Sequence, residues 1–310
     1  MFINIIILFF LFLLLGLSAD FLVNNISYIA KALRIRMFAL GIILGIVTSL
    51  PETSVGINTS LEGIPGLSVG NLLGSIVVIM GLILGCSLIL NRRINTDGEL
   101  KIVIPQIAII FIPLFLGLDG SYNLIDGIIM ILSYLSLVFY LYRANYSFGD
   151  GIGVAIIERN KILKAISFSL LGIAAILFFS HWIVEITTVL LAKWNISKLT
   201  IGILVFSIGT NLPEISIALT SWRKKNSELS LSHLMSSAFT NVLILGGLST
   251  ISTISFTVNH SYYNVFGFIA LVLFLFVIFY WSKKRLDRWE GGILALCYLI
   301  FLILNLVLIP

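Results

Sequence analysis

Apolar residues form long unbroken segments along this chain, and polar residues gather in short stretches between them. The run Ile5–Leu17, for example, contains only apolar side chains and one glycine. A helix needs about 20 mostly apolar residues to cross the ~30 Å hydrocarbon core of a bilayer. The segments that reach or approach this length are 1–28, 38–60, 66–90, 102–118, 122–143, 164–192, 199–222, 230–252, 262–282 and 289–309. We therefore predict an all-α integral membrane protein with ten transmembrane helices.

The composition supports a membrane protein. Of the 310 residues, 59% are hydrophobic and only 11% are charged, and the mean hydropathy is +1.12. Soluble domains carry about 25% charged residues. The basic residues lie in short loops between apolar segments, which excludes a nucleic-acid-binding surface. Cys86 and Cys297 both lie inside apolar segments, so we expect buried thiols and neither a disulfide nor a metal site.

The basic residues are distributed unevenly between alternate loops. All but Lys193 and Lys198 of the 19 lysines and arginines fall in one set of loops. Loops rich in lysine and arginine stay on the cytoplasmic side. We therefore predict a multi-pass protein of the cell membrane with both termini outside. The second set of five helices then crosses in the opposite sense to the first, as an inverted repeat with units at 1–146 and 164–310 joined by a loop at 147–163.

Two of the apolar segments are interrupted by the same kind of polar sequence. The first is Thr48-Ser49-Leu50-Pro51-Glu52 and the second is Thr210-Asn211-Leu212-Pro213-Glu214. A charged group at the bilayer centre costs at least about 2.5–3.5 kcal/mol. A proline also removes a backbone hydrogen bond, which is tolerated at this depth where the backbone lines a cavity. Two copies of such a sequence indicate two half-sites that face each other.

The two interruptions belong to a longer repeat. At the offset of 162 residues that relates Thr48 to Thr210, Ser54 falls on Ser216, Ser75 on Ser237 and Gly85 on Gly247. In each half the serine lies 23 residues after the glutamate, on the next predicted helix. Agreement without gaps across a loop is stronger support for a repeat than the shared string alone.

The polar residues of the repeat favour a hard cation. Two glutamates supply two negative charges, and no histidine or cysteine accompanies either string. Calcium takes about six to eight oxygen ligands, and subsets of such a shell fit sodium. A proton-carrying glutamate pair and a purely structural brace of two kinked helices are the alternatives. The candidate ligands are Glu52, Glu214, Thr48, Ser49, Thr210, Asn211, Ser75, Ser237 and Asn241.

The paired strings, each followed by a segment of small residues on the next helix, resemble the alpha repeats of the sodium/calcium exchangers. The motifs lie at about 38–90 and 199–252, and the resemblance covers nearly the whole chain. It implies a membrane antiporter that moves Ca²⁺ against Na⁺ by alternating access, while the first and sixth helices slide across a packed core. It implies no enzymatic activity, no cofactor and no obligatory protein partner.

The resemblance also assigns roles to the candidate ligands. It implies that Glu52 and Glu214 are the principal ligands and that Thr48 and Thr210 coordinate through backbone oxygens. Ser49, Ser75 and Ser237 would supply hydroxyls, and Asn211 stands where serine is usual.

This chain departs from the family pattern in its neutral ligands. Ile79 replaces an asparagine that the family usually has four residues after Ser75, whereas the equivalent position of the second repeat is Asn241. The second repeat also has His233 where the first has Asn71. These changes leave Na⁺ coupling, H⁺ coupling and a non-transporting homologue open. An intramembrane enzyme would need a nucleophile with its base or a metal-binding cluster, and neither is present in the sequence.

His181, Glu185 and Asp20 also lie inside predicted helices. His181 and Glu185 are four residues apart on one helical face, and we expect them to pair at the membrane interface rather than to line a vestibule. We expect a structural role for Asp20 in the first helix as well.

Overall fold

The computed structural model describes residues 2–32, 37–96, 98–144, 159–191, 197–223 and 227–307. The elements of the first half are α1 (Phe2–Ala32), α2 (Met37–Thr48), α3 (Leu50–Leu61), α4 (Pro65–Val77), the π-helix η1 (Val78–Ile83), α5 (Leu84–Asn91), β1 (Arg93–Asn95), α6 (Leu100–Leu116), the 3₁₀-helix η2 (Gly117–Asp119), β2 (Ser121–Tyr122) and α7 (Leu124–Arg143).

The second half repeats this order of long helices. Its elements are α8 (Arg159–Leu191), α9 (Lys198–Ile201), the π-helix η3 (Gly202–Phe206), α10 (Ser207–Thr210), α11 (Leu212–Arg223), α12 (Ser227–Ile251), β3 (Ile254–Ser255), α13 (His260–Lys283), β4 (Arg285–Asp287) and α14 (Arg288–Val307). The described part of the chain is therefore all-α apart from four very short strands.

Most of the predicted membrane segments are long apolar helices. Within the described residues, eight helical stretches are long and apolar enough to cross a bilayer, and the bent pair 198–210 and 212–223 makes a ninth. The predicted segment 38–60 corresponds to α2 and α3, which have 12 residues each and are separated at Ser49. The membrane architecture is confirmed, and the count of ten crossings stays a prediction.

Helix α8 begins earlier than the sequence predicts. It starts at Arg159, so the last residues of the expected loop at 147–163 are helical, whereas residues 147–158 lie outside the described part of the chain. Hydropathy marks only the part of a helix that lies in lipid. Lys161 and Lys164 are good helix formers and extend α8 beyond that part.

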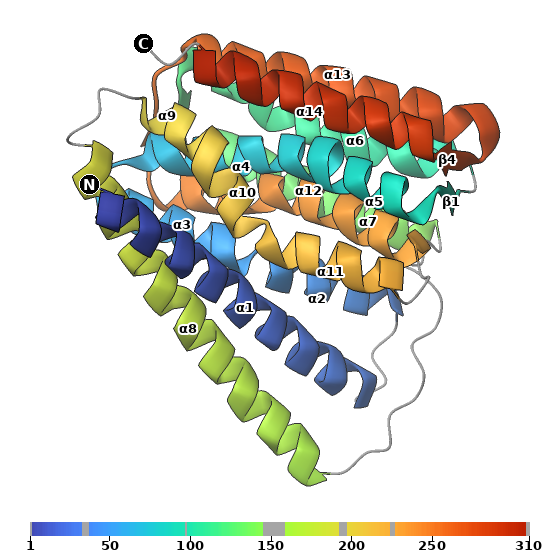
Figure 1. Cartoon of the computed structure of the whole chain (residues 1–310), viewed down its shortest axis with the longest axis horizontal. Coiled ribbons are helices and arrows are strands. Elements are labelled where there is room, and N and C mark those ends of the chain that lie inside the picture. The colour runs from blue at the N-terminus through green and yellow to red at the C-terminus, as the bar shows by residue number, and fades with distance from the viewer. Residues whose placement is uncertain are drawn as a thin grey trace.

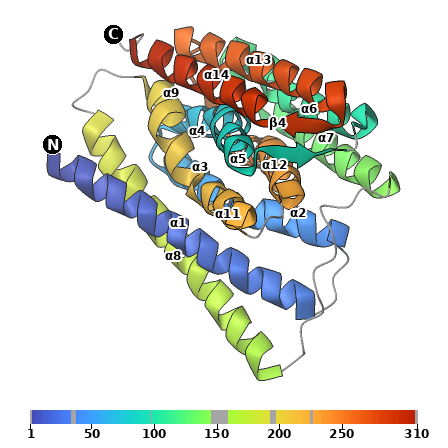
Figure 2. The same cartoon turned by 45° about the vertical axis from the view of Figure 1, so that its right-hand side comes forward.

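Two central helices are enclosed by the others. In the most apolar part of Pro65–Asn91, 83% of the residues are buried, and the value for Leu231–Ile251 is 78%. The corresponding value is only 22% for Lys161–Leu191 and 33% for Ile3–Ile29. Helices α1 and α8 lie side by side along one edge, oblique to the rest, while α13 and α14 lie at the opposite edge (Figures 1 and 2). The central helices α4 and α12 carry Ser75 and Ser237.

Glycines let the two halves approach closely at the centre. A Cβ atom placed on Gly70 of α4 would lie 2.1 Å from the carbonyl oxygen of Leu199, and one placed on Gly202 of η3 would lie 2.3 Å from that of Leu67. The backbones of α4 and of α9–η3 therefore touch, as small residues allow between membrane helices. This contact fixes the broken helix of the second half against the central helix of the first.

Two short ribbons join the halves at the ends of the bundle. Strand β1 pairs with β4, with Arg93 opposite Asp287, and β2 pairs with β3, with Ser121 opposite Ser255. Helix α6 separates β1 from β2, so the ribbons lie at opposite ends. The ribbon β1–β4 lies at the right in Figure 1, and both chain termini lie at the left. We call the β1–β4 end the basic end, since α5, α7, α11 and α13 all lead into basic residues there.

Candidate cation site

Both polar interruptions break their helices in the same way. Ser49 separates α2 from α3 with φ −88° and ψ 10°, and Asn211 separates α10 from α11 with φ −86° and ψ 11°. Pro51 and Pro213 lie in the first turn of the helices that follow, where a missing N–H is tolerated. The break therefore falls two residues before each proline, and the prolines start helices instead of bending them.

The two glutamates lie in the first turns of these restarted helices. Glu52 is 2% exposed and Glu214 is 1% exposed. One oxygen of each carboxylate, Oε2 in both, is buried without a hydrogen-bond partner. Among the described residues no lysine, arginine or histidine lies within ion-pair distance of either carboxylate. A buried, unpaired carboxylate is costly unless a cation or a proton neutralises it.

The two carboxylates share one region of the protein. They are close enough to repel each other. The hydroxyl of Thr210 is within hydrogen-bonding reach of Glu52, and that of Thr48 is within reach of Glu214. Each glutamate therefore lies beside a threonine from the other half of the chain, so the two predicted half-sites lie face to face.

Hydroxyls and amides of the central helices complete the site. Ser237 donates to Glu214 Oε1 across 3.2 Å and lies 3.4 Å from the Thr48 hydroxyl. The side-chain amide of Asn211 donates to Ser75 across 2.8 Å, which leaves Asn211 Oδ1 buried and without a partner. A cation can bind to this free amide oxygen and to the two free carboxylate oxygens.

Ser49 and Asn241 lie at the margin of this network. The Ser49 hydroxyl donates to the Gly45 carbonyl of its own helix across 2.9 Å. The Asn241 amide donates to the Leu72 carbonyl of α4 across 3.3 Å, and it therefore links α12 to α4. Ile79, at the equivalent position of the first half, is 1% exposed and lies in η1. All nine candidate ligands are buried.

The oxygen character of the site limits the cations that it suits. Among the described residues, no group of three or more His, Cys, Asp or Glu side chains has the arrangement of a metal site. A cation here would be bound by two carboxylates and neutral oxygens. This donor set suits calcium or sodium better than zinc or copper.

One residue near the site was not predicted as a participant. Asn71 Oδ1 accepts a hydrogen bond from the Thr210 hydroxyl at 3.0 Å, and Asn71 Nδ2 is buried without a partner. Asn71 lies in the small-residue segment Gly70–Ser75 of α4, which the sequence indicates as a packing motif. Its contact with Thr210 depends on how the two halves pack. On α12, His233 Nε2 is also buried without a partner.

The predicted pair on α8 is confirmed. His181 Nε2 lies 3.8 Å from Glu185 Oε2, and both side chains are about half exposed. The structure records no contact between this pair and the residues of the glutamate site.

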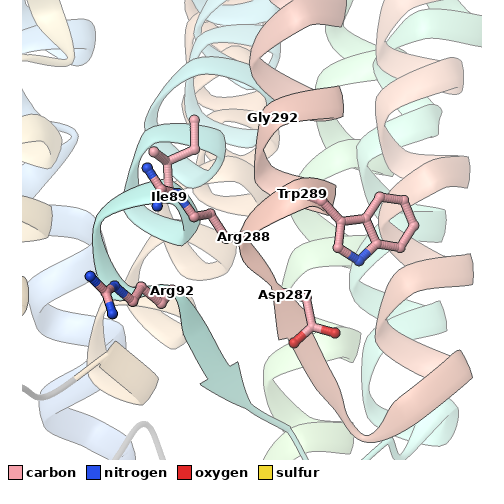
Figure 3. A pocket seen from close by; sticks show the side chains of 6 residues that line it. All are labelled: Ile89, Arg92, Asp287, Arg288, Trp289 and Gly292. Atoms are coloured by element: carbon pink, nitrogen blue, oxygen red, sulfur yellow. The ribbon is translucent and has the colours of Figure 1, made fainter.

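A separate hollow of about 670 Å³ opens at the basic end, beside β1 and β4 (Figure 3). Arg92 follows α5, and Arg288 and Trp289 begin α14; the Lys283 ammonium lies 5.1 Å from the centre of the Trp289 ring. Arginine and tryptophan together are typical of the headgroup level of a membrane. The full lining is Ile89, Arg92, Asp287, Arg288, Trp289 and Gly292. Neither glutamate is part of it, so this hollow is not the cation site.

Comparison with known proteins identifies the family. The sequence pattern of the family described as "Sodium/calcium exchanger protein" matches residues 3–143 and 164–307, which include every candidate ligand. This chain belongs to the sodium/calcium exchanger family. Membership makes it a membrane antiporter, with cations as its substrates. The two matched stretches exclude the connection between α7 and α8.

Two relatives found by sequence match most of the chain. The chain is 26% identical to the sodium/calcium exchanger MaX1 of Methanosarcina acetivorans over 348 residues, covering 95% of this chain and 97% of the relative. It is 28% identical to the inner membrane protein YrbG of Escherichia coli over 282 residues, covering 88% and 87% of the two chains.

Solved structures share the fold of this exchanger. A structure of the sodium-calcium exchanger NCX_Mj soaked with Na⁺ and Sr²⁺ matches 97% of this chain and 98% of its own, with a TM-score of 0.68 and 24% identity. A structure of the H⁺/Ca²⁺ exchanger CAX matches 97% of this chain and 87% of its own, with a TM-score of 0.75 and 15% identity. The shared fold therefore occurs with both kinds of coupling ion.

Proposed function

We propose that this chain exchanges Ca²⁺ for Na⁺ across the cell membrane through the site between Glu52 and Glu214. The observation that carries the proposal is the pair of buried carboxylates, each with a free oxygen and with no basic side chain of the described residues beside it. The relative MaX1 bears the name of a sodium/calcium exchanger and covers nearly the same length.

The ligand set explains why the two ions would compete. Ca²⁺ and Na⁺ both need the negative charge of Glu52 and Glu214, so one must leave before the other binds. The free Asn211 oxygen and the hydroxyls of Ser75 and Ser237 add neutral ligands on both sides of the carboxylates. The proposed activity consists of ion binding and conformational change, without covalent chemistry or a cofactor.

The proposed architecture is ten crossings in two inverted units, at 1–146 and 164–310, with both termini outside. Several contacts support this arrangement. Strand β1 follows the third long helix of the first unit and pairs with β4, which precedes the last helix of the second; β3 and β2 have the reciprocal relation. Helices α5 and α14 pack together, as do α12 and α7. These reciprocal contacts are what a two-fold axis between the units would produce.

The proposed access change is a sliding of α1 and α8 over the packed core. These helices pack against each other, and among the described spans they are, together with α7, the least buried. An empty site keeps two mutually repelling carboxylates at the surface over which α1 and α8 slide, whereas a site loaded with cations is neutral. Neutralisation therefore lowers the cost of the movement, and the empty carrier stays in place, as exchange requires.

The rival function is Ca²⁺/H⁺ exchange on the same scaffold. The fold likeness to CAX, the apolar Ile79 and His233, whose buried Nε2 has no hydrogen-bond partner, favour it. In that case protons, and not Na⁺, would neutralise Glu52 and Glu214 during the return step.

The deciding experiment is ⁴⁵Ca²⁺ uptake into proteoliposomes loaded with Na⁺, with K⁺-loaded and acid-loaded vesicles as controls. Uptake that requires internal Na⁺ supports the proposal. Uptake driven only by a proton gradient moves the protein to Ca²⁺/H⁺ exchange. Absence of uptake under every gradient contradicts both functions.

A further inference from the structure

Helix α1 carries a single charge within its apolar span. Asp20 is the one Asp, Glu, Lys or Arg between Ile3 and Ile29, a stretch with a mean hydropathy of 2.7. The side chain is half-buried. A carboxylate inside such a helix is costly, and residues of this kind in membrane segments usually mark ion pathways. The sequence alone favours a structural role for Asp20 over a place in an outer vestibule.

Asp20 lies against the helix that carries Glu214. Its carboxylate is within hydrogen-bonding reach of the hydroxyl of Ser216, two residues after Glu214 on α11. One turn earlier on α1, a Cβ atom on Gly16 would lie 2.7 Å from Cβ of Leu212. The turn Gly16–Asp20 of α1 therefore packs alongside the turn Leu212–Ser216 of α11.

The charge of Asp20 reaches the cation site. Its carboxylate is close enough to Glu214 to repel it. Glu214 is 1% exposed and its Oε2 has no hydrogen-bond partner. A buried carboxylate oxygen without a partner, in the field of a second carboxylate, is an arrangement that a cation would stabilise.

The equivalent contact in the other half has no charge. Ser54, which corresponds to Ser216 at the offset of 162, makes a short hydrogen bond to Ser180 of α8. Asn58 also donates to the Ser180 hydroxyl, at 3.1 Å. The two sliding helices thus touch their broken helices at equivalent serines, but only α1 brings a carboxylate to that contact. This asymmetry distinguishes the two ends of the cation path.

We propose that Asp20 is a third carboxylate of the transport path, which binds the cation between Glu214 and the basic end of the molecule. This inference rests on the proposed function. Ser216 follows Glu214 toward the C-terminal end of α11, so Asp20 lies on that side of the glutamate pair. On this proposal, a cation that passes the lysines and arginines at the basic end meets Asp20 before it reaches Glu214. A negative charge at this point raises the local cation concentration where the surrounding charge is repulsive.

The test compares ion affinity from the two sides of the membrane. Exchange of ⁴⁵Ca²⁺ for unlabelled Ca²⁺ is measured in inside-out and right-side-out membrane vesicles, because this reaction needs neither a Na⁺ nor a proton gradient. We expect Asp20→Asn to raise the half-saturating Ca²⁺ concentration about tenfold at the basic end and less than twofold at the other end. Asp20→Glu should restore most of the affinity. Ser18→Ala is the matched control, since its hydroxyl bonds only the Leu14 carbonyl of its own helix.

Two outcomes would overturn the proposal. One is an equal shift at both ends in Asp20→Asn, which would indicate a structural role, and the other is no shift at either end. If Asp20→Asn does not fold, Ser216→Ala gives the same comparison, with an expected rise of about two- to threefold at the basic end only. Wild-type vesicles without Ca²⁺/Ca²⁺ exchange would contradict the proposed function itself, whereas active wild type with symmetric variants would contradict only the role of Asp20.

Discussion

Asn211 and Ser75 are joined by a hydrogen bond of 2.8 Å, although 136 residues separate them along the chain. Asn211 is the residue at which the broken helix of the second half is interrupted, and Ser75 lies on the central helix of the first half. The bond therefore holds the break against the core. It also leaves the side-chain oxygen of Asn211 buried and without a hydrogen-bond partner. One side chain thus fixes the geometry of the break and supplies a candidate ligand.

The first prediction concerns Asn211. Asn211→Ala removes both the bond to Ser75 and the free oxygen, so we expect a severalfold weaker apparent Na⁺ affinity with Ca²⁺ transport retained, because the two carboxylates remain. The measurement is the Na⁺ dependence of ⁴⁵Ca²⁺ uptake. Asn305→Ala is the control, since Asn305 is also buried but bonds only the Phe301 carbonyl of α14. An equal loss in both variants would contradict a ligand role for Asn211.

The glutamate pair gives the second prediction. Glu52→Gln and Glu214→Gln each remove half of the negative charge of the site, and we expect Ca²⁺ uptake to fall to background in both. In buffer without Na⁺ or Ca²⁺ both variants should melt at a higher temperature than the wild type, because the repulsion between the carboxylates is removed. Glu62→Gln, at the exposed end of α3, should change neither uptake nor melting. Near-normal exchange in both site variants would contradict the two-carboxylate site.

A third prediction tests the close approach of α4 to η3. Gly202→Ala places a methyl group 2.3 Å from the Leu67 carbonyl oxygen, and this backbone contact cannot relax by a rotamer change. We expect a destabilisation of about 1–3 kcal/mol, seen as a lower melting temperature in detergent. Gly267→Ala on α13 meets no atom within 4 Å and should be neutral. A neutral Gly202→Ala would show that the two halves are not in backbone contact there.

The fourth prediction concerns orientation. The basic end should face the cytoplasm, and both chain termini should be accessible from outside. Tags fused to each terminus and probed with a protease on intact cells provide the measurement. A tag inserted in the turn after α5, next to Arg92, is the control and should be protected until the cells are opened. Termini on opposite faces would exclude an even number of crossings.

Local sequence was sufficient for the long apolar helices, because a segment's length and hydropathy decide whether it can cross a bilayer. The candidate ligands followed from the repeat, since Glu52 and Glu214 stand out as charges in apolar segments. The two polar strings also predicted where the helices are interrupted, although not the residue of each break: the preceding helices end at Thr48 and Thr210. Proline fits the first turn of a new helix, which moves the break toward the N-terminus.

Contacts between the two halves could not be predicted from the sequence. The bond from Thr210 to Asn71 and the approach of Asp20 to Ser216 depend on which helix faces pack together. Hydropathy does not determine this in a membrane, because lipid and protein interior are equally apolar. The short ribbon β1–β4 could not be predicted for a similar reason, since it pairs residues far apart in the chain.

The oblique pair α1 and α8 has a consequence for the surrounding lipid. These helices contain 31 and 33 residues, so at 1.5 Å per residue they are about 45–50 Å long, whereas the hydrocarbon core is about 30 Å thick. A helix whose apolar part is longer than the hydrocarbon core is accommodated by tilting, by kinking or by local thickening of the bilayer, and its tilt depends on bilayer thickness. A sliding movement of a tilted pair changes the angle or the depth at which it meets the acyl chains. Hydrophobic mismatch therefore acts directly on the two helices that would have to move.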